Sequence, residues 1–137
     1  MPELPDYLSL SADYAEYHRT PGNRRCHLVG VPLIAYAVTA WSCFGSGLPV
    51  AALLLPIYFL WDGRVGAVLT LFMAVSALLA ARLPGWTSWA AFLVGWAFQF
   101  YGHAVHEKKS PAFAKNLAHL LIGPAWVARE LTGSSAP

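Results

Sequence analysis

Charged side chains are scarce in this sequence of 137 residues, at 12% against the roughly 25% of an ordinary soluble domain. Hydrophobic residues make up 57%, and they gather in blocks rather than in the regular stripes that are typical of a soluble core. The scarcity of charge therefore argues against an ordinary water-soluble domain and indicates an integral membrane protein. The length predicts a single membrane domain over residues 1–137.

Long basic runs, pairable cysteines and a basic leader are also missing. The net charge is only +2 and no basic run is long enough to follow phosphates, so nucleic acid is not an expected partner. Cys26 and Cys43 fall on one expected helix, roughly 25 Å apart, which excludes a disulfide between them. Glu3 and Asp6 stand where a secretory signal would be basic. We therefore expect the first hydrophobic segment to stay in the mature protein.

Four apolar blocks predict four short transmembrane helices, over residues 24–44, 49–61, 65–81 and 86–105. Turn-forming sequences separate them, at residues 45–47, 62–64 and 82–85. A bilayer core needs about 20 helical residues, so the second and third blocks are marginal by length. Thinning of the bilayer, shared helix ends or a paired half-insertion is expected there. The predicted fold class is an all-α integral membrane protein.

Two further helices are expected outside the four blocks. A pre-membrane helix is predicted over residues 11–20 with Ser11 as its N-cap, and Asn23 is predicted to cap the first long helix. Residues 112–131 carry apolar side chains at helical spacing, interrupted at residues 123–124. This segment is too short to cross a bilayer, and the spacing predicts an interfacial amphipathic helix.

Basic residues divide unevenly between the two ends of the expected helices. With four spans and the N-terminus inside, eight of the nine basic residues are cytoplasmic and only Arg82 lies outside. An odd number of spans would spoil this division. Both termini are therefore expected on the cytoplasmic side.

All the histidines fall at the cytoplasmic ends of segments in this topology: His18, His27, His103, His106 and His119. Neutral imidazole is the commonest metal ligand in proteins, and nitrogen-rich sites suit iron, zinc, copper or nickel. His18 and His27 flank a tight turn, whereas His103, His106 and Glu107 would share one face of an α-helix. Two helix ends could thus supply ligand pairs to one ion.

The same distribution has a simpler explanation. Polar residues are excluded from the apolar blocks, so histidines are forced to the segment ends. His119 has the weakest claim, since a solvated position on an amphipathic helix explains it equally well. Glu107 beside Lys108 and Lys109 is also typical of a surface ion pair.

Aromatic residues are numerous, and they fit a membrane protein without any cofactor. Tyr14, Tyr17 and the six tryptophans are more typical of interface belts and packing than of a cofactor site. Gln99 is different because it lies deeper in the fourth block, where a side-chain amide needs a partner.

Two stretches, HRTPGNRRCHLVGVP at residues 18–32 and QFYGHAVHEKKSPA at residues 99–112, resemble the signatures of a small membrane family long labelled as a domain of unknown function. Its characterised fungal member is an iron(II)-dependent dioxygenase that shortens 2-hydroxy fatty acids by one carbon in the breakdown of phytosphingosine. The resemblance spans about residues 10 to 130. The matching positions are His18, Asn23, His27, Gly30, Gln99, Gly102, His103, Glu107 and Pro111.

The resemblance implies an enzyme with an Fe²⁺ cofactor whose substrates are a 2-hydroxy fatty acid, or a related lipid acid, and O2. The implied metal ligands are His18, His27 and His103, to which local spacing adds His106. Catalytic roles are expected for Glu107, as the partner of a metal-bound imidazole, and for Asn23. Contacts with the substrate are expected from Arg24, Arg25, Lys108 and Gln99.

This chemistry suits a site at a membrane surface. A 2-hydroxy carboxylate can chelate iron through its hydroxyl and one carboxylate oxygen, which leaves a position for dioxygen. Cleavage of the bond between C1 and C2 would release a fatty acid one carbon shorter. The alkyl tail can stay in the leaflet while the acid head reaches the basic residues at the cytoplasmic rim. For a short member of this family, the expected location is a bacterial inner membrane.

Two other classes of function stay open on the sequence. Histidines on neighbouring membrane helices can hold a haem for electron transfer, although His18 and His27 lie outside the long apolar runs. A four-helix transporter or scaffold is the non-catalytic alternative, and ionisable residues inside the spans would be its usual mark. No such residue lies in the middle of an expected span.

Overall fold

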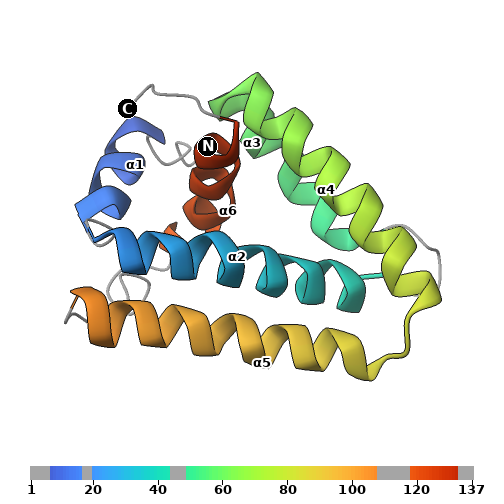
Figure 1. The fold of residues 1–137 in the computed structure, drawn as a ribbon. Helices are drawn as coiled ribbons and strands as arrows, with labels where there is room; N and C mark the ends of the chain where they lie inside the picture. The colour runs from blue at the N-terminus through green and yellow to red at the C-terminus, as the bar shows by residue number, and fades with distance from the viewer. Residues whose placement is uncertain (1–6, 17–19, 44–48, 108–117, 133–137) are drawn as a thin grey trace.

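The computed structural model describes residues 7–16, 20–43, 49–107 and 118–132, without the side chains of residues 16, 106, 107, 118 and 119. Within these ranges the regular elements are helices and no strand occurs, which confirms the all-α prediction for the described part. In chain order (Figure 1) they are α1 (Tyr7–Glu16), α2 (Pro21–Trp41), the 3-10 helix η1 (Val50–Leu54), α3 (Leu55–Trp61), α4 (Gly63–Arg82), α5 (Trp86–Tyr101), the π-helix η2 (Gly102–Glu107) and α6 (Ala118–Leu131).

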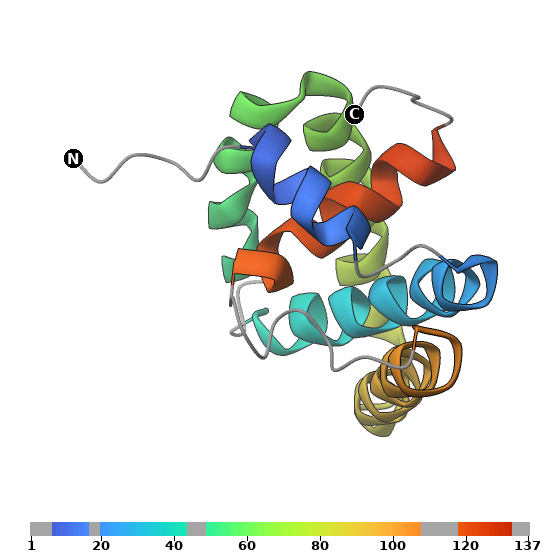
Figure 2. The ribbon, with the colours of Figure 1, turned by 90° about the vertical axis from the view of Figure 1, so that its left-hand side faces the viewer.

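Helices α2 and α5 form an antiparallel pair along one side of the molecule (Figure 1). Gly30 and Gly95 allow the two backbones to touch, because a Cβ atom at either glycine would lie 2.8 Å from the carbonyl oxygen of the other. Small residues at helix contacts are a common device of membrane proteins. Figure 2 shows α5 on the outer side of α2, away from α1 and α6. The pair brings the start of α2 next to the end of α5.

Helices α3 and α4 are joined by Asp62 and pack against each other. The Asp62 carboxylate caps α4 by accepting hydrogen bonds from the backbone N–H groups of Arg64, at 2.8 Å, and Val65, at 3.4 Å. Gly66 leaves room for the Phe59 ring, which a Cβ atom at that position would overlap. The second apolar block therefore forms two short helices: α3 packs against α4, and η1 contacts α3 and α2.

Helix α6 lies at the centre of the described fold, in contact with α1, α2 and α4. Consecutive side chains from Ala125 to Arg129 are buried, so the helix is covered on every side. The prediction of an amphipathic surface helix is wrong for this stretch. Spacing showed one apolar face, but small residues such as Gly123 let other helices cover the remaining faces.

Two predicted helix starts are also wrong. Helix α1 begins at Tyr7, and Ser11 is a buried residue within it rather than its N-cap. Thr20 caps α2, because its Oγ1 accepts a hydrogen bond from the Asn23 backbone N–H at 3.3 Å. Pro21 fits the first helical position, where its missing N–H costs no hydrogen bond. This start leaves Asn23 inside the helix, where its side chain is completely buried.

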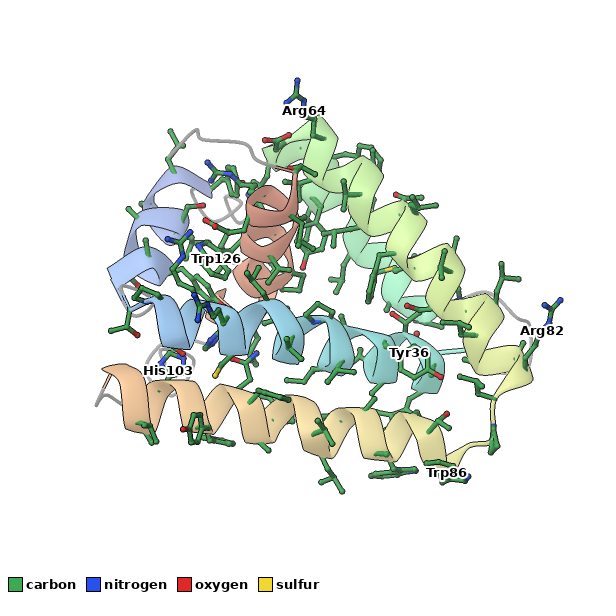
Figure 3. All side chains as sticks on the ribbon, viewed as in Figure 1. Tyr36, Arg64, Arg82, Trp86, His103 and Trp126 are labelled. Atoms are coloured by element: carbon green, nitrogen blue, oxygen red, sulfur yellow. The ribbon has the colours of Figure 1, made fainter. Side chains whose placement is uncertain are left out.

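One helix among the described residues, α4, is long and apolar enough to cross a membrane by length and composition, with a mean hydropathy of 2.0 over its best window. The segment Val50–Trp61 is apolar but shorter. Four spans are not confirmed by this criterion. Arg64 and Arg82 lie at the two ends of α4 and point away from the other helices (Figure 3).

Candidate functional site

Two histidines meet where the start of α2 lies beside η2. His27 comes from α2 and His103 from η2, and their Nε2 atoms are 3.1 Å apart. The two rings are nearly perpendicular, at 87°. Both side chains are almost completely buried, with 1% and 3% of their surfaces exposed. Two ring nitrogens thus face each other in a site that largely excludes water.

The other nitrogen of His27 fixes the protonation of its ring. Nδ1 of His27 lies 3.0 Å from the backbone carbonyl oxygen of Asn23. A carbonyl can only accept a hydrogen bond, so Nδ1 carries the proton and Nε2 of the neutral ring keeps its lone pair. Metal-binding histidines are commonly oriented in this way by a carbonyl or carboxylate on the far nitrogen.

The spacing of the histidine pair fits two ligands of one metal ion. Nitrogen ligands about 2.1 Å from an ion and at right angles to each other would stand about 3.0 Å apart. The same spacing also permits a hydrogen bond from His103 to the lone pair of His27. No third His, Cys, Asp or Glu side chain joins the pair among the described residues. The structure therefore shows two buried imidazole nitrogens whose spacing suits either two ligands of one ion or a hydrogen bond.

Gly102 and the π-helix explain how His103 reaches α2. A Cβ atom at Gly102 would overlap Oδ1 of Asn23 and lie 3.0 Å from Cβ of Cys26. Only glycine therefore fits this close approach. The prediction of an α-helix through residue 105 is wrong from Gly102 onward, where the chain forms a π-helix. The α-helical spacing from which His106 was added as a ligand does not apply in a π-turn, whose hydrogen bonds join residues five apart.

Several predicted site residues fall outside what the structure describes. These are His18 and Lys108, and the side chains of His106, Glu107 and His119. Their roles stay predictions. Gln99 is described. Its side chain is buried, and it lies near the end of α5, about one turn before His103 of η2. Asn23 lies against Gly102 and orients His27 through its backbone carbonyl.

The two predicted arginines lie at the rim. Arg24 is half-exposed and forms an ion pair with Glu130 of α6. Its guanidinium carbon is 6.0 Å from the centre of the Trp126 ring. These contacts connect α2 to α6. Arg25 is exposed.

Sequence reasoning missed two aromatic residues that pack against His27. The rings of Tyr14 and Trp126 lie edge-on to His27, with centres 6.3 and 6.5 Å away. Figure 3 shows Trp126 on the α6 side of α2 and His103 on the α5 side. Burial raises the pKa of the Tyr14 phenol above its usual value. The small, uncharged neighbours of Trp126 in the sequence were the available signal that it is buried.

A cavity of about 470 Å³ leads away from the histidine pair between α2, α3, α4, α5 and α6. Its lining is mainly apolar. Tyr14, Gln99 and the two histidines supply polar groups at one end, and Thr39 lies three helical turns along α2. The size is within the range of about 300–1,000 Å³ that is usual for small-molecule sites. A polar head and a long apolar tail would match this lining.

The matches to known proteins include both helices that supply the histidine pair. Residues 6–135 match the family described as 2-hydroxy-palmitic acid dioxygenase Mpo1-like. The 2-hydroxy-palmitic acid dioxygenase MPO1 of Saccharomyces cerevisiae is 30% identical over 131 residues, which are 87% of this chain and 75% of that protein. No solved structure matches the chain.

Proposed function

Because this chain belongs to the Mpo1-like family of 2-hydroxy-palmitic acid dioxygenases, we propose that it is an Fe²⁺-dependent enzyme that shortens 2-hydroxy fatty acids by one carbon at the membrane interface. One observation carries the proposal: the buried pair of His27 and His103 stands at the polar end of a long apolar cavity. The pair supplies nitrogen ligands, and the cavity supplies space for an alkyl tail.

His27 and His103 would hold the iron together with His18. His106, which follows His103 in η2, stays the proposed fourth ligand, without support from α-helical spacing. Iron bound there would supply the activation of dioxygen that cleavage of the bond between C1 and C2 requires. The Asn23 carbonyl prepares His27 for this role, because it holds the ring proton on Nδ1 and leaves the lone pair on Nε2. Glu107 is proposed to accept a hydrogen bond from another metal-bound imidazole.

The remaining residues would bind and orient the substrate. The Gln99 amide lines the cavity beside the histidines, where it can donate a hydrogen bond to the acid or hydroxyl group of the substrate. Arg24, Arg25 and Lys108 would attract the carboxylate to the rim by their charge. Tyr14 and Trp126 pack against His27 and would limit the entry of water there.

The balance of atoms constrains the one-carbon product. A 2-hydroxy acid and one O2 contain the atoms and electrons of a fatty acid one carbon shorter, one CO2 and one water. Release of formate instead would require two more electrons and two protons from a reductant. We therefore propose CO2 as the product when no reductant is added.

The outward-facing side chains support a place in the membrane. Large apolar residues on α4 and α5 are exposed, among them Leu71 at 67%, Leu93 at 66% and Trp86 at 69%. Soluble monomers rarely expose such surfaces. Trp86 and Trp89, both exposed at the start of α5, suit a membrane–water interface. We propose the four-span topology with both termini in the cytoplasm, which labelling of cysteines introduced at positions 5 and 135 would test.

The haem alternative loses support from the histidine geometry. Two imidazoles on opposite sides of a haem iron must lie about 4 Å apart, counted from a metal–nitrogen distance of about 2 Å on each side. His27 and His103 are closer than that, at 3.1 Å. Purified protein without a haem absorption band would agree with this conclusion.

The direct test is an assay with purified protein loaded with Fe²⁺ under anaerobic conditions. Exposure to O2 and 2-hydroxypalmitic acid labelled with ¹³C at C1 should give the fatty acid one carbon shorter and labelled CO2. His27→Ala should lose most bound iron and the activity, because one ligand and the orienting carbonyl contact are lost together. Val29→Ala, exposed on the same helix, is the matched control. The proposal is wrong if iron-loaded protein forms no shortened acid, or if His27→Ala keeps full iron content and turnover.

A further inference from the structure

The cavity that begins at the histidine pair follows α2 turn by turn. His27, Val31, Ala35 and Thr39 succeed one another at intervals of four residues, and all four line it. They therefore share one face of the helix. Each of these residues therefore lies one helical turn farther from the histidine pair than the one before it.

The length of this lining corresponds to a particular number of carbon atoms. From His27 to Thr39 the helix rises about 18 Å, at about 1.5 Å per residue. An extended chain of single bonds advances roughly 1.2 Å per bond, judged from the reach of an extended peptide. About 15 bonds therefore fit between the two ends, which is the length of a chain of about 16 carbons.

The far end of the cavity is held in place by hydrogen bonds. Ala51 lines it, and its backbone N–H donates to Oγ of Ser42 at 3.2 Å. The backbone N–H of Val50 donates to the Ser42 carbonyl oxygen at 3.0 Å. Both contacts fasten the start of η1 to the end of α2. Thr39 is buried beside them, with 2% of its surface exposed.

We infer that this cavity is a ruler for the substrate tail, with a limit near 16 carbons set by Thr39 and Ala51. The inference rests on the proposed function and adds the residues that determine specificity for chain length. Tails longer than the limit would have to bend, displace the junction between η1 and α2, or leave the cavity beside the exposed Leu54. Shorter tails fit, but they bury fewer methylene groups and should therefore bind less tightly.

Ala35 lies at an intermediate position along the cavity. It lies eight residues beyond His27, at a helical rise of about 12 Å or about 10 bonds. A leucine at this position would project into the lining about two thirds of the way along it. A leucine at Ala51 would shorten only the far end. The two substitutions should therefore lower the limit by different amounts.

The experiment compares turnover of a series of 2-hydroxy fatty acids of about 8 to 20 carbons. The wild type should act on chains up to about 16 carbons and lose kcat/KM beyond that length. Ala51→Leu should move the limit down by a few carbons, and Ala35→Leu should move it to about 11. Ala97→Leu makes the same change on the exposed face of α5 and should keep the wild-type profile.

A variant with a larger cavity shows whether a changed length profile reflects the cavity or merely a loss of folding. Leu54 lines the cavity in η1 and is partly exposed, so Leu54→Ala should be tolerated and should raise the accepted length. Thermal unfolding of each variant shows whether it is folded. If the wild type shortens 2-hydroxy acids but all three cavity variants keep its length profile, the ruler is wrong and the proposed function stands. If the wild type acts on no member of the series, the proposed function itself fails.

Discussion

The two ends of the α2 and α5 pair are built differently. At one end, His27, Asn23 and His103 are buried and face one another, and a π-helix replaces the regular α5. At the other end, Trp41 donates a hydrogen bond to Ser88 at 2.9 Å between two regular helices. Buried polar groups and irregular backbone cluster at functional sites because they are costly elsewhere. The contrast supports placing the proposed chemistry at the histidine end, whereas Trp41 and Ser88 join two regular helices at the other end.

Gly102→Val should give the largest effect, because it breaks the histidine end directly. The added side chain would overlap Asn23 Oδ1 and force η2 away from α2. Overpacking of this kind costs about 1–3 kcal/mol of unfolding free energy. Loss of the close approach of His103 to His27 should reduce iron content and turnover by at least about 10- to 100-fold.

A matched glycine gives the control for that prediction. Gly63 at the start of α4 has open space around its Cβ position, so Gly63→Ala should leave activity unchanged and stability equal or slightly higher. Calorimetry and metal analysis of both variants measure the two effects. Equal iron content in Gly102→Val and wild type would show that the close contact is not needed for metal binding.

Trp41→Phe should affect stability without affecting chemistry. It removes the hydrogen bond to Ser88 while keeping aromatic contacts with Trp89 and Phe92, whose ring centres lie 4.7 and 4.9 Å away. The expected loss is about 0.5–1.5 kcal/mol of unfolding free energy, with iron content unchanged. A double-mutant cycle with Ser88→Ala isolates the hydrogen bond. A loss of iron in Trp41→Phe would contradict the division between the two ends.

Variants of the ion pair between Arg24 and Glu130 can separate a role in stability from a role in substrate binding. Either Arg24→Gln or Glu130→Gln removes the pair, and for half-exposed groups the loss of stability should be below about 1 kcal/mol. If Arg24 also attracts the substrate carboxylate, Arg24→Gln should raise KM several-fold, whereas Glu130→Gln should not. Steady-state kinetics at low salt measures the difference. Equal KM values in the two variants would limit Arg24 to joining α2 and α6.

The helices could be placed from the sequence more reliably than their contacts. Apolar blocks bounded by glycine and proline located the long helices to within a few residues, because composition changes sharply at those points. The burial of α6 could not be predicted, since periodicity shows one apolar face and not what covers the others. Four spans stay a prediction, because only α4 passes the length and hydropathy criterion in the described part.

For the candidate site too, the sequence indicated which residues meet better than how they meet. The resemblance brought His27 and His103 together in one proposed site, and the structure places their Nε2 atoms 3.1 Å apart. The spacing of residues did not show the π-helix, nor the close contact of Gly102 with Asn23 from a distant part of the chain. Tyr14 was missed for a related reason: nothing in its own helix shows that it lies over His27.

Tyr14→Phe should give the smallest effect at ordinary pH and a distinct one in alkali. Burial raises the pKa of Tyr14 in the folded protein, whereas the unfolded chain ionises near the ordinary value of about 10. Below that value the phenol is protonated in both states and contributes no pH dependence. Above it the unfolded state loses the proton first, so the free energy of unfolding falls as the pH rises. Tyr14→Phe removes this contribution and should lose less stability between pH values of about 9 and 11. Denaturant unfolding of both proteins at those two pH values measures the difference, and an equal fall in both would show that Tyr14 ionises as freely in the folded state as in the unfolded one.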